Sequence, residues 1–425
     1  MVLHESRKYG FARFLTQRVA QALEAAGKPG TPWVHVNDVA GFIGPEVFRT
    51  REQLVRCCLE DIAMGKLHGL TIGLDVCSTL HMDVSLDDLD WCLDQIMPAS
   101  PAYLMALPTK IDPMLGYLTT GFQDHVRLRE KFGCRVNDRM WSFFRELGVI
   151  DAAGQPTRHF GDPLWVYLQY CRRKADQRTD AQILGEGRQQ IAETDRRGVF
   201  LAVGHGERPH DPEPSLRKRI RQIYADAREC IWQEIPEEFA GRVSGARRLR
   251  SRSADRRDYI LHPMSGEHLS DESLAIVQRL RATQADDTDV QIVISDGLNA
   301  RAVTAVGHLD VLLSRLRSEL NRSGFRTSPT PLLVQSGRVR IGYRIGEQLF
   351  GGLAGRRAVM HIIGERPGSG HHTLSIYITV ADGCVWRVPD RVDHNITKVV
   401  SGIASTALLP ETAAAEAVRI LRQPA

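Results

Sequence analysis

The sequence predicts an α/β protein with two globular parts, and three observations carry this prediction. Residues 1–130 alternate between short apolar segments and amphipathic segments at intervals of about 30–40 residues, a pattern typical of parallel strands buried under helices. Residues 135–235 are mostly helical and charged. Alternating strand and helix patterns resume near residue 268. A helical segment is therefore expected between two α/β parts.

The first part is expected to contain three strands with helices between them. Strands are predicted at 33–40, 70–77 and 102–107, and helices at 5–26, 51–65 and 86–97. The polar residues just past the strands of a parallel sheet collect at one edge. The residues expected at that edge are Asn37, Asp38, Glu46, Asp75, Lys110 and Asp112.

The second part reads as a small layered α/β domain. Ser270 has the chemistry of a helix N-cap. Strands are predicted at 289–294, 331–334, 358–363 and 373–380, and helices at 299–323 and 411–422. The turn after the first strand, Ser295-Asp-Gly-Leu, could hold a phosphate at a helix N-terminus, although it lacks the full glycine fingerprint. Gly364-Glu-Arg-Pro-Gly368 is either a ligand-holding loop or a plain turn.

The composition excludes several classes of protein. The 425 residues are 43% hydrophobic and 25% charged with a net charge of +4, so we expect a soluble protein without a nucleic-acid partner. No apolar run approaches the ~18 residues of a membrane span, and the first 30 residues lack a signal-peptide core. The eight cysteines form no CxxC pair. We therefore expect a reduced, cytoplasmic protein without a metal site, a disulfide framework or a membrane partner.

Other polar clusters have both a functional and a structural interpretation. Seven arginines between 236 and 258 could meet an anionic partner, but a solvated interdomain tether is favoured. Asp75 and Cys77, followed by His81, could form a metal or nucleophilic site, but a satisfied polar group in the core is favoured. For His205 and His210, a glycine-rich surface turn is favoured over a metal site.

Glu46 and Asp112 are the two carboxylates of the first part that are of most chemical interest. Each follows an apolar strand and lies beside a proline that stiffens its loop. Two carboxylates at a buried edge suit a small cation, because an ammonium gains charge-assisted hydrogen bonds there. The alternative is that both residues cap loops or helices.

Several long motifs resemble ethanolamine ammonia-lyase. Gly41-Phe-Ile-Gly-Pro-Glu46 and the segments 65–77 and 112–125 resemble the last barrel strands of its large subunit. The segments 290–298, 337–339, 363–368 and 393–397 resemble its small subunit. The resemblance covers about residues 1–235 and 265–425. It implies the C-terminal portion of a TIM (β/α)8 barrel at 1–150, a helical tail at 151–235, an Arg-rich linker at 236–265 and a Rossmann-like, cobalamin-binding α/β domain at 266–425.

The same resemblance implies a reaction and site residues. The family converts ethanolamine to acetaldehyde and ammonia by adenosylcobalamin-dependent radical chemistry. Glu46 and Asp112 match its substrate-binding carboxylates. Val339, Glu365 and Asn395 match its cobalamin contacts, although the family usually has a cysteine at the position of Asn395. The implied partners are ethanolamine and other chains of the enzyme in an oligomer, and the implied location includes a bacterial microcompartment.

The first part departs from a complete barrel. The family's substrate-binding arginine, glutamine and asparagine lie on earlier strands that are not found here. A closed barrel needs ~200–250 residues, and three strands cannot close. We therefore expect another chain or an upstream segment to complete the barrel, and the chain alone to be inactive. The alternative is a catalytically inactive remnant that at most binds cobalamin.

Overall fold

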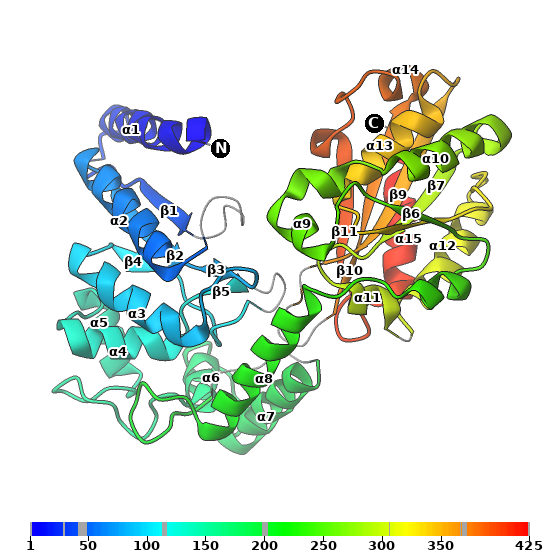
Figure 1. The fold of residues 1–425 in the computed structure, drawn as a ribbon. Helices are drawn as coiled ribbons and strands as arrows, with labels where there is room; N and C mark the ends of the chain where they lie inside the picture. Colours follow the sequence, from blue (N-terminus) through cyan, green and yellow to red (C-terminus); the bar gives the residue numbers. More distant parts are fainter. Residues whose placement is uncertain are drawn as a thin grey trace. The chain divides into compact units, whose positions relative to one another are not determined.

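The computed structural model describes residues 2–28, 30–40, 49–112, 117–197, 203–305, 307–365, 367 and 372–423. Contacts between residues divide the described chain into two compact units (Figure 1). The first unit holds residues up to 112 and 117–224, and the second begins at residue 225. No helix in the described part of the chain combines the length and the hydropathy needed to cross a bilayer.

The first unit contains a sheet of three parallel strands in the order β1-β2-β4. β2 (Thr71–Val76) is the buried central strand, between β1 (His35–Ala40) and β4 (Tyr103–Leu104). Helices α2 (Arg51–Leu67) and α3 (Leu86–Ile96) connect the strands, and each begins with a capping box, at Thr50 and Ser85. The predicted parallel strand–helix alternation is confirmed here. The other elements of this region are α1 (Val2–Ala25), β3 (Ser78–Thr79), η1 (Met97–Ala99) and β5 (Tyr117–Leu118).

The rest of the first unit is helical, as the sequence predicts for residues 135–235. Helices α6 and α7 pack around a small core of Leu168, Cys171 and Ile183. The helices are α4 (Phe122–Phe132), α5 (Asp138–Glu146), α6 (Pro163–Arg173), α7 (Asp180–Arg196) and α8 (Pro214–Cys230), and the last turns of α8, from residue 225, belong to the second unit.

The second unit is built on a six-stranded sheet in the order β11-β10-β9-β7-β8-β6. The four strands from β9 to β6 are parallel, whereas β10 is antiparallel to both β9 and β11. All four parallel strands therefore present their carboxyl ends at one edge of the sheet. The strands are β6 (Arg247–Arg250), β7 (Val290–Ser295), β8 (Leu332–Gln335), β9 (Arg356–Gly364), β10 (Leu374–Asp382) and β11 (Thr397–Ile403).

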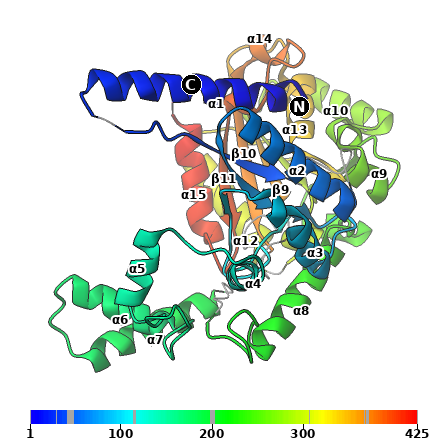
Figure 2. The same ribbon diagram turned by 90° about the vertical axis from the view of Figure 1, so that its left-hand side faces the viewer.

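Helices cover both faces of this sheet (Figures 1 and 2). Ile292 on β7 packs against α11, α12 and α15, whereas its neighbour Val293 packs on the opposite side with α10, α13 and α14. This alternation follows from the period of two in a strand and gives the unit two hydrophobic layers. The helices are α10 (Asp271–Gln284), α11 (Ala300–Thr304), α12 (Leu309–Arg322), α13 (Val339–Phe350), α14 (Gly383–Trp386) and α15 (Pro410–Leu421).

The Arg-rich segment 236–265 differs from the expected linker. It contains η2 (Glu237–Arg242), strand β6 at the edge of the sheet and helix α9 (Arg256–Leu261). The side chain of Leu249 is buried between two exposed or half-exposed arginines, so a short alternating strand is hidden in a charged run. The segment therefore forms part of the second unit instead of a tether before it.

Candidate functional site

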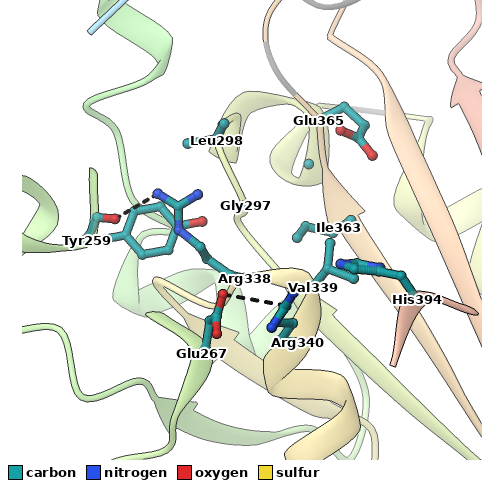
Figure 3. A pocket seen from close by; sticks show the side chains of 11 residues that line it. Tyr259, Glu267, Gly297, Leu298, Arg338, Val339, Arg340, Ile363, Glu365 and His394 are labelled. Carbon is teal, nitrogen blue, oxygen red and sulfur yellow. Dashed lines mark hydrogen bonds and ion pairs between the residues drawn. The ribbon is translucent and has the colours of Figure 1, made fainter. Parts of the chain in front are cut away.

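A pocket of about 250 Å³ opens at the carboxyl ends of the parallel strands in the second unit (Figure 3). Ligands of open α/β sheets bind at this edge, outside the carboxyl ends of the strands. Val339 and Glu365, two of the three residues predicted to contact a cofactor, both line the pocket. The full lining is Tyr259, Glu267, Gly297, Leu298, Arg338, Val339, Arg340, Ile363, Gly364, Glu365 and His394.

The floor of the pocket depends on a close approach between two loops. Gly297, in the turn after β7, has a φ of 53°, and a Cβ there would lie 2.1 Å from the carbonyl oxygen of Gly364. The backbone N–H of Leu298 donates to that same carbonyl at 3.1 Å. Only glycine at position 297 permits both the left-handed backbone and this contact.

A buried ion pair holds the turn after β7 in place. The guanidinium of Arg256 lies 3.4 Å from Asp296 Oδ2 and donates to the Gly297 carbonyl at 2.9 Å. The other carboxylate oxygen of Asp296 accepts from the N–H of Gly337 at 3.3 Å. Burial raises the pKa of Asp296 to about 6. The pair thus ties the β7 turn to the segment before α13. Sequence reasoning missed it, because Arg256 was read as part of the tether.

Val339, the first residue of α13, is held by a buried histidine. His361 on β9 lies with Nδ1 3.3 Å from the Val339 carbonyl and Nε2 2.7 Å from Ser295 Oγ. Burial lowers the pKa of His361 to about 4, so the ring is neutral near pH 7. A neutral ring can donate from Nδ1 to the carbonyl and accept from the Ser295 hydroxyl at Nε2.

His361 gives the second unit a pH-dependent stability. Its folded pKa lies below its usual value of about 6.5, so the unfolded chain binds more protons between about pH 4 and 6.5. This stabilisation is complete above that window and is lost as the pH falls through it. As the pH rises from about 4 to about 6.5, the unfolding free energy of the parent should increase by about 3 kcal/mol relative to that of His361→Gln.

Chemical denaturation at several pH values measures this difference. The raised pKa of Asp296 acts in the opposite direction, but it is common to both proteins and cancels in the comparison. His262→Gln, at an exposed histidine, serves as the control. A pH-independent difference between the parent and His361→Gln would show that the ring stays protonatable in the folded state.

Glu365 lies directly after β9, and its side chain is half-buried beside the pocket. Its Oε1 accepts from the Tyr377 hydroxyl at 3.2 Å, and its backbone N–H donates to the Thr373 carbonyl at 3.0 Å. The carboxylate is therefore held in place but keeps further acceptor capacity. Asn395 is not among the lining residues: its backbone and side-chain nitrogens both donate to Asp393, and its neighbour His394 lines the pocket instead.

The pocket combines apolar and polar groups. Leu298, Val339 and Ile363 supply apolar surface, as Figure 3 shows around Val339. Arg338 donates through Nη2 to the Tyr259 carbonyl at 2.9 Å, whereas its buried Nε has no hydrogen-bond partner in the described part of the chain. Arginine donors opposite the Glu365 acceptor suit a ligand that carries several amide groups on an apolar body.

In the first unit, Asp112 is half-buried near the carboxyl end of β2. Its backbone N–H donates to the Tyr117 carbonyl at 2.9 Å. Burial raises the pKa of Asp75, and the charge of Asp112 adds a smaller contribution in the same direction. Glu46, the other predicted carboxylate, lies outside the described residues. Of the pair, the structure therefore places only Asp112.

The polar residues of the other two clusters, around Asp75 and around His210, have partners within the protein. Asp75 is buried and accepts a hydrogen bond from the Thr119 hydroxyl. The ring of His81 contacts Thr79 Oγ1 at 3.0 Å, and that of His210 lies 3.0 Å from Glu130.

Comparison with known families divides the chain in two. Residues 1–159 match the family described as ethanolamine ammonia lyase large subunit. Residues 201–425, slightly more than half of the chain, match the family described as ethanolamine ammonia-lyase light chain. The order of the two matches agrees with the order of the motifs in the sequence.

Two curated relatives carry the large-subunit likeness. The ethanolamine ammonia-lyase large subunits of Escherichia coli (strain K12) and Salmonella typhimurium (strain LT2) are each 33% identical to the chain over 162 residues. The alignments cover 38% of this chain and 32% of each relative. The chain thus spans about a third of the length of these curated relatives.

Proposed function

We propose that this chain, which belongs to the ethanolamine ammonia-lyase family and joins large-subunit to light-chain sequence, takes part in the conversion of ethanolamine to acetaldehyde and ammonia. The proposed reaction depends on adenosylcobalamin. The family is one of carbon–nitrogen lyases. The observation that carries the proposal is the pocket of the second unit, which gathers Val339 and Glu365 at the carboxyl edge of the sheet.

The chemistry of the pocket fits one edge of a corrin. The corrin has an apolar ring with amide side chains, and the lining offers apolar surface, arginine and histidine donors and the Glu365 acceptor. The buried Nε of Arg338, which lacks a partner among the described residues, could donate to an amide carbonyl. A volume of about 250 Å³ is suited to an edge of the ring and its amides, with the remainder lying outside.

The residues of this chain would bind and orient, while the cofactor supplies the radical chemistry. When bound, adenosylcobalamin provides a deoxyadenosyl radical by homolysis of its cobalt–carbon bond. Glu365 would accept hydrogen bonds from corrin amides, and Val339 would pack against the ring. The Arg256–Asp296 pair and His361 would hold the two loops that present these residues.

In the first unit we assign the three parallel strands to a (β/α)8 barrel shared with other ethanolamine ammonia-lyase sequence. Glu46 and Asp112 would bind the substrate, with Asp112 accepting hydrogen bonds from its ammonium group. A carboxylate that is only half-exposed gains more from such a charge-assisted contact than one in open solvent. Other large- or small-subunit chains are the expected partners.

Glu365→Ala tests the cofactor site. A hydrogen bond to a charged group contributes about 1.5–3 kcal/mol, so we expect cobalamin affinity to fall by about 10- to 100-fold. Absorbance titration of the 425-residue chain with adenosylcobalamin measures the affinity. Glu365→Gln keeps an acceptor oxygen and should lose less. Equal affinity of the parent and Glu365→Ala would mean that this loop is only a turn.

A further inference from the structure

We propose that Asp226, Cys230 and His372 form a Zn²⁺ site in the second unit, a function that the cobalamin pocket does not require. Asp226 and Cys230 lie one helical turn apart near the end of α8, so their side chains share a face. His372 precedes β10 and brings a ring nitrogen to the same place. One ligand atom from each residue can be chosen so that all lie within 4.8 Å of one another.

The separations are close to those that Zn²⁺ requires. His372 Nε2 lies 3.3 Å from Asp226 Oδ2, and Cys230 Sγ lies 4.0 Å from that same oxygen. Bond lengths of about 2.0–2.3 Å in a tetrahedral site place neighbouring ligand atoms about 3.4–3.6 Å apart. Cys230 Sγ also lies 3.8 Å from the other ring nitrogen of His372, Nδ1. A small movement of Cys230 together with a turn of the imidazole ring would therefore complete three corners of a tetrahedron.

The surrounding residues favour the required protonation states. Asn299, which is fully buried, places its Nδ2 3.2 Å and its Oδ1 3.3 Å from His372 Nδ1. In the tautomer with a proton on Nδ1, that nitrogen donates to Oδ1 and leaves Nε2 for the metal. A metal-bound histidine is commonly oriented in this way by its second nitrogen. Arg301 pairs with the other oxygen of Asp226 and with Glu229, which leaves Asp226 Oδ2 facing His372.

The donor set selects the metal. One thiolate, one imidazole and one carboxylate suit Zn²⁺, and Co²⁺ can replace it as a spectroscopic probe, whereas Ca²⁺ and Mg²⁺ prefer oxygen ligands alone. Burial raises the pKa of the Cys230 thiol to about 12, so we expect the thiolate to form only when the metal displaces the proton. The three protein ligands leave a fourth position for water or another donor.

Titration of the cofactor-free 425-residue chain with Co²⁺ tests the site. We expect stoichiometric binding with a near-ultraviolet thiolate-to-cobalt charge-transfer band that excess Zn²⁺ abolishes. Cys230→Ser should remove the band, and His372→Ala should weaken binding. Asn299→Ala should weaken Zn²⁺ binding by about 10- to 100-fold. Cys384→Ser, at an exposed cysteine of the same unit, is the matched control and should keep the band.

Thermal unfolding measured with and without Zn²⁺ shows whether each variant is folded and whether it binds the metal. Zn²⁺ at about 100 times its dissociation constant should raise the Tm of the parent by about 5–10 °C, and that of His372→Ala, a partly exposed position, by much less. The proposal is overturned if the parent binds neither ion, or if Cys230→Ser keeps the charge-transfer band.

Discussion

Replacing Gly297 with alanine should lower cobalamin affinity by at least about 30-fold. The new Cβ would lie 2.1 Å from the Gly364 carbonyl oxygen, and the φ of 53° is strained for any residue with a side chain. Backbone strain costs about 1–3 kcal/mol and overpacking a similar amount. The collision is relieved at the lowest cost in free energy if the β7 turn moves away from Gly364. This movement separates the two loops that form the floor of the pocket.

Gly307→Ala is the matched control for this prediction. Gly307 also has a positive φ, 81°, but within the described part of the chain nothing lies within 4 Å of its would-be Cβ. It should show the strain without the collision, and cobalamin affinity should stay close to that of the parent. Absorbance titration together with a thermal melt separates a local effect from unfolding. A Gly297→Ala protein that binds cobalamin like the parent would show that this turn does not shape the site.

Replacing Asp112 with alanine should lower kcat/KM for ethanolamine by about 30-fold or more. Removing one partner of a desolvated charge pair costs about 2–5 kcal/mol, and the proposed partner here is the substrate ammonium. The assay is acetaldehyde release in the presence of adenosylcobalamin. It is run with a large-subunit fragment that supplies the family's earlier barrel strands, so that Asp112 of this chain is the aspartate under test.

The matched control for Asp112 is Glu60→Gln. Glu60 is an exposed carboxylate on α2 that pairs with Arg56 one turn away, so its loss should leave turnover unchanged. Asp112→Glu should recover part of the activity if the carboxylate itself binds the substrate. Turnover by Asp112→Ala at the parent's rate would remove this residue from the proposed site.

Much of the fold could be predicted because local patterns decide it. The Ser270 N-cap, whose side chain accepts from the Ser273 N–H, and the apolar strand at β7 are both readable from neighbouring residues. The expected helix 299–323 is divided into α11 and α12, which end and begin on either side of Gly307. Strand β11 and helix α13 were not predicted, because packing against distant elements supports both.

The site was predictable only in part. Val339 and Glu365 meet because α13 follows β8 and Glu365 follows β9, and both strands end at the same edge. The buried role of Arg256 could not be predicted, because it lies in a run of arginines whose composition predicts solvent exposure. In the structure its side chain is only 8% exposed and pairs with Asp296. That pairing joins residues 40 positions apart, so no local pattern could indicate it.

Hydrogen–deuterium exchange of the 425-residue chain with and without adenosylcobalamin tests the proposed pocket most directly. We predict that bound cofactor slows exchange in the β7 turn at 296–298, at the start of α13 at 338–340 and at the end of β9 at 363–365. The helices α5 and α6 of the first unit should show no change. Protection confined to other segments, or cofactor binding without any change at these three, would contradict the assignment of this pocket to cobalamin.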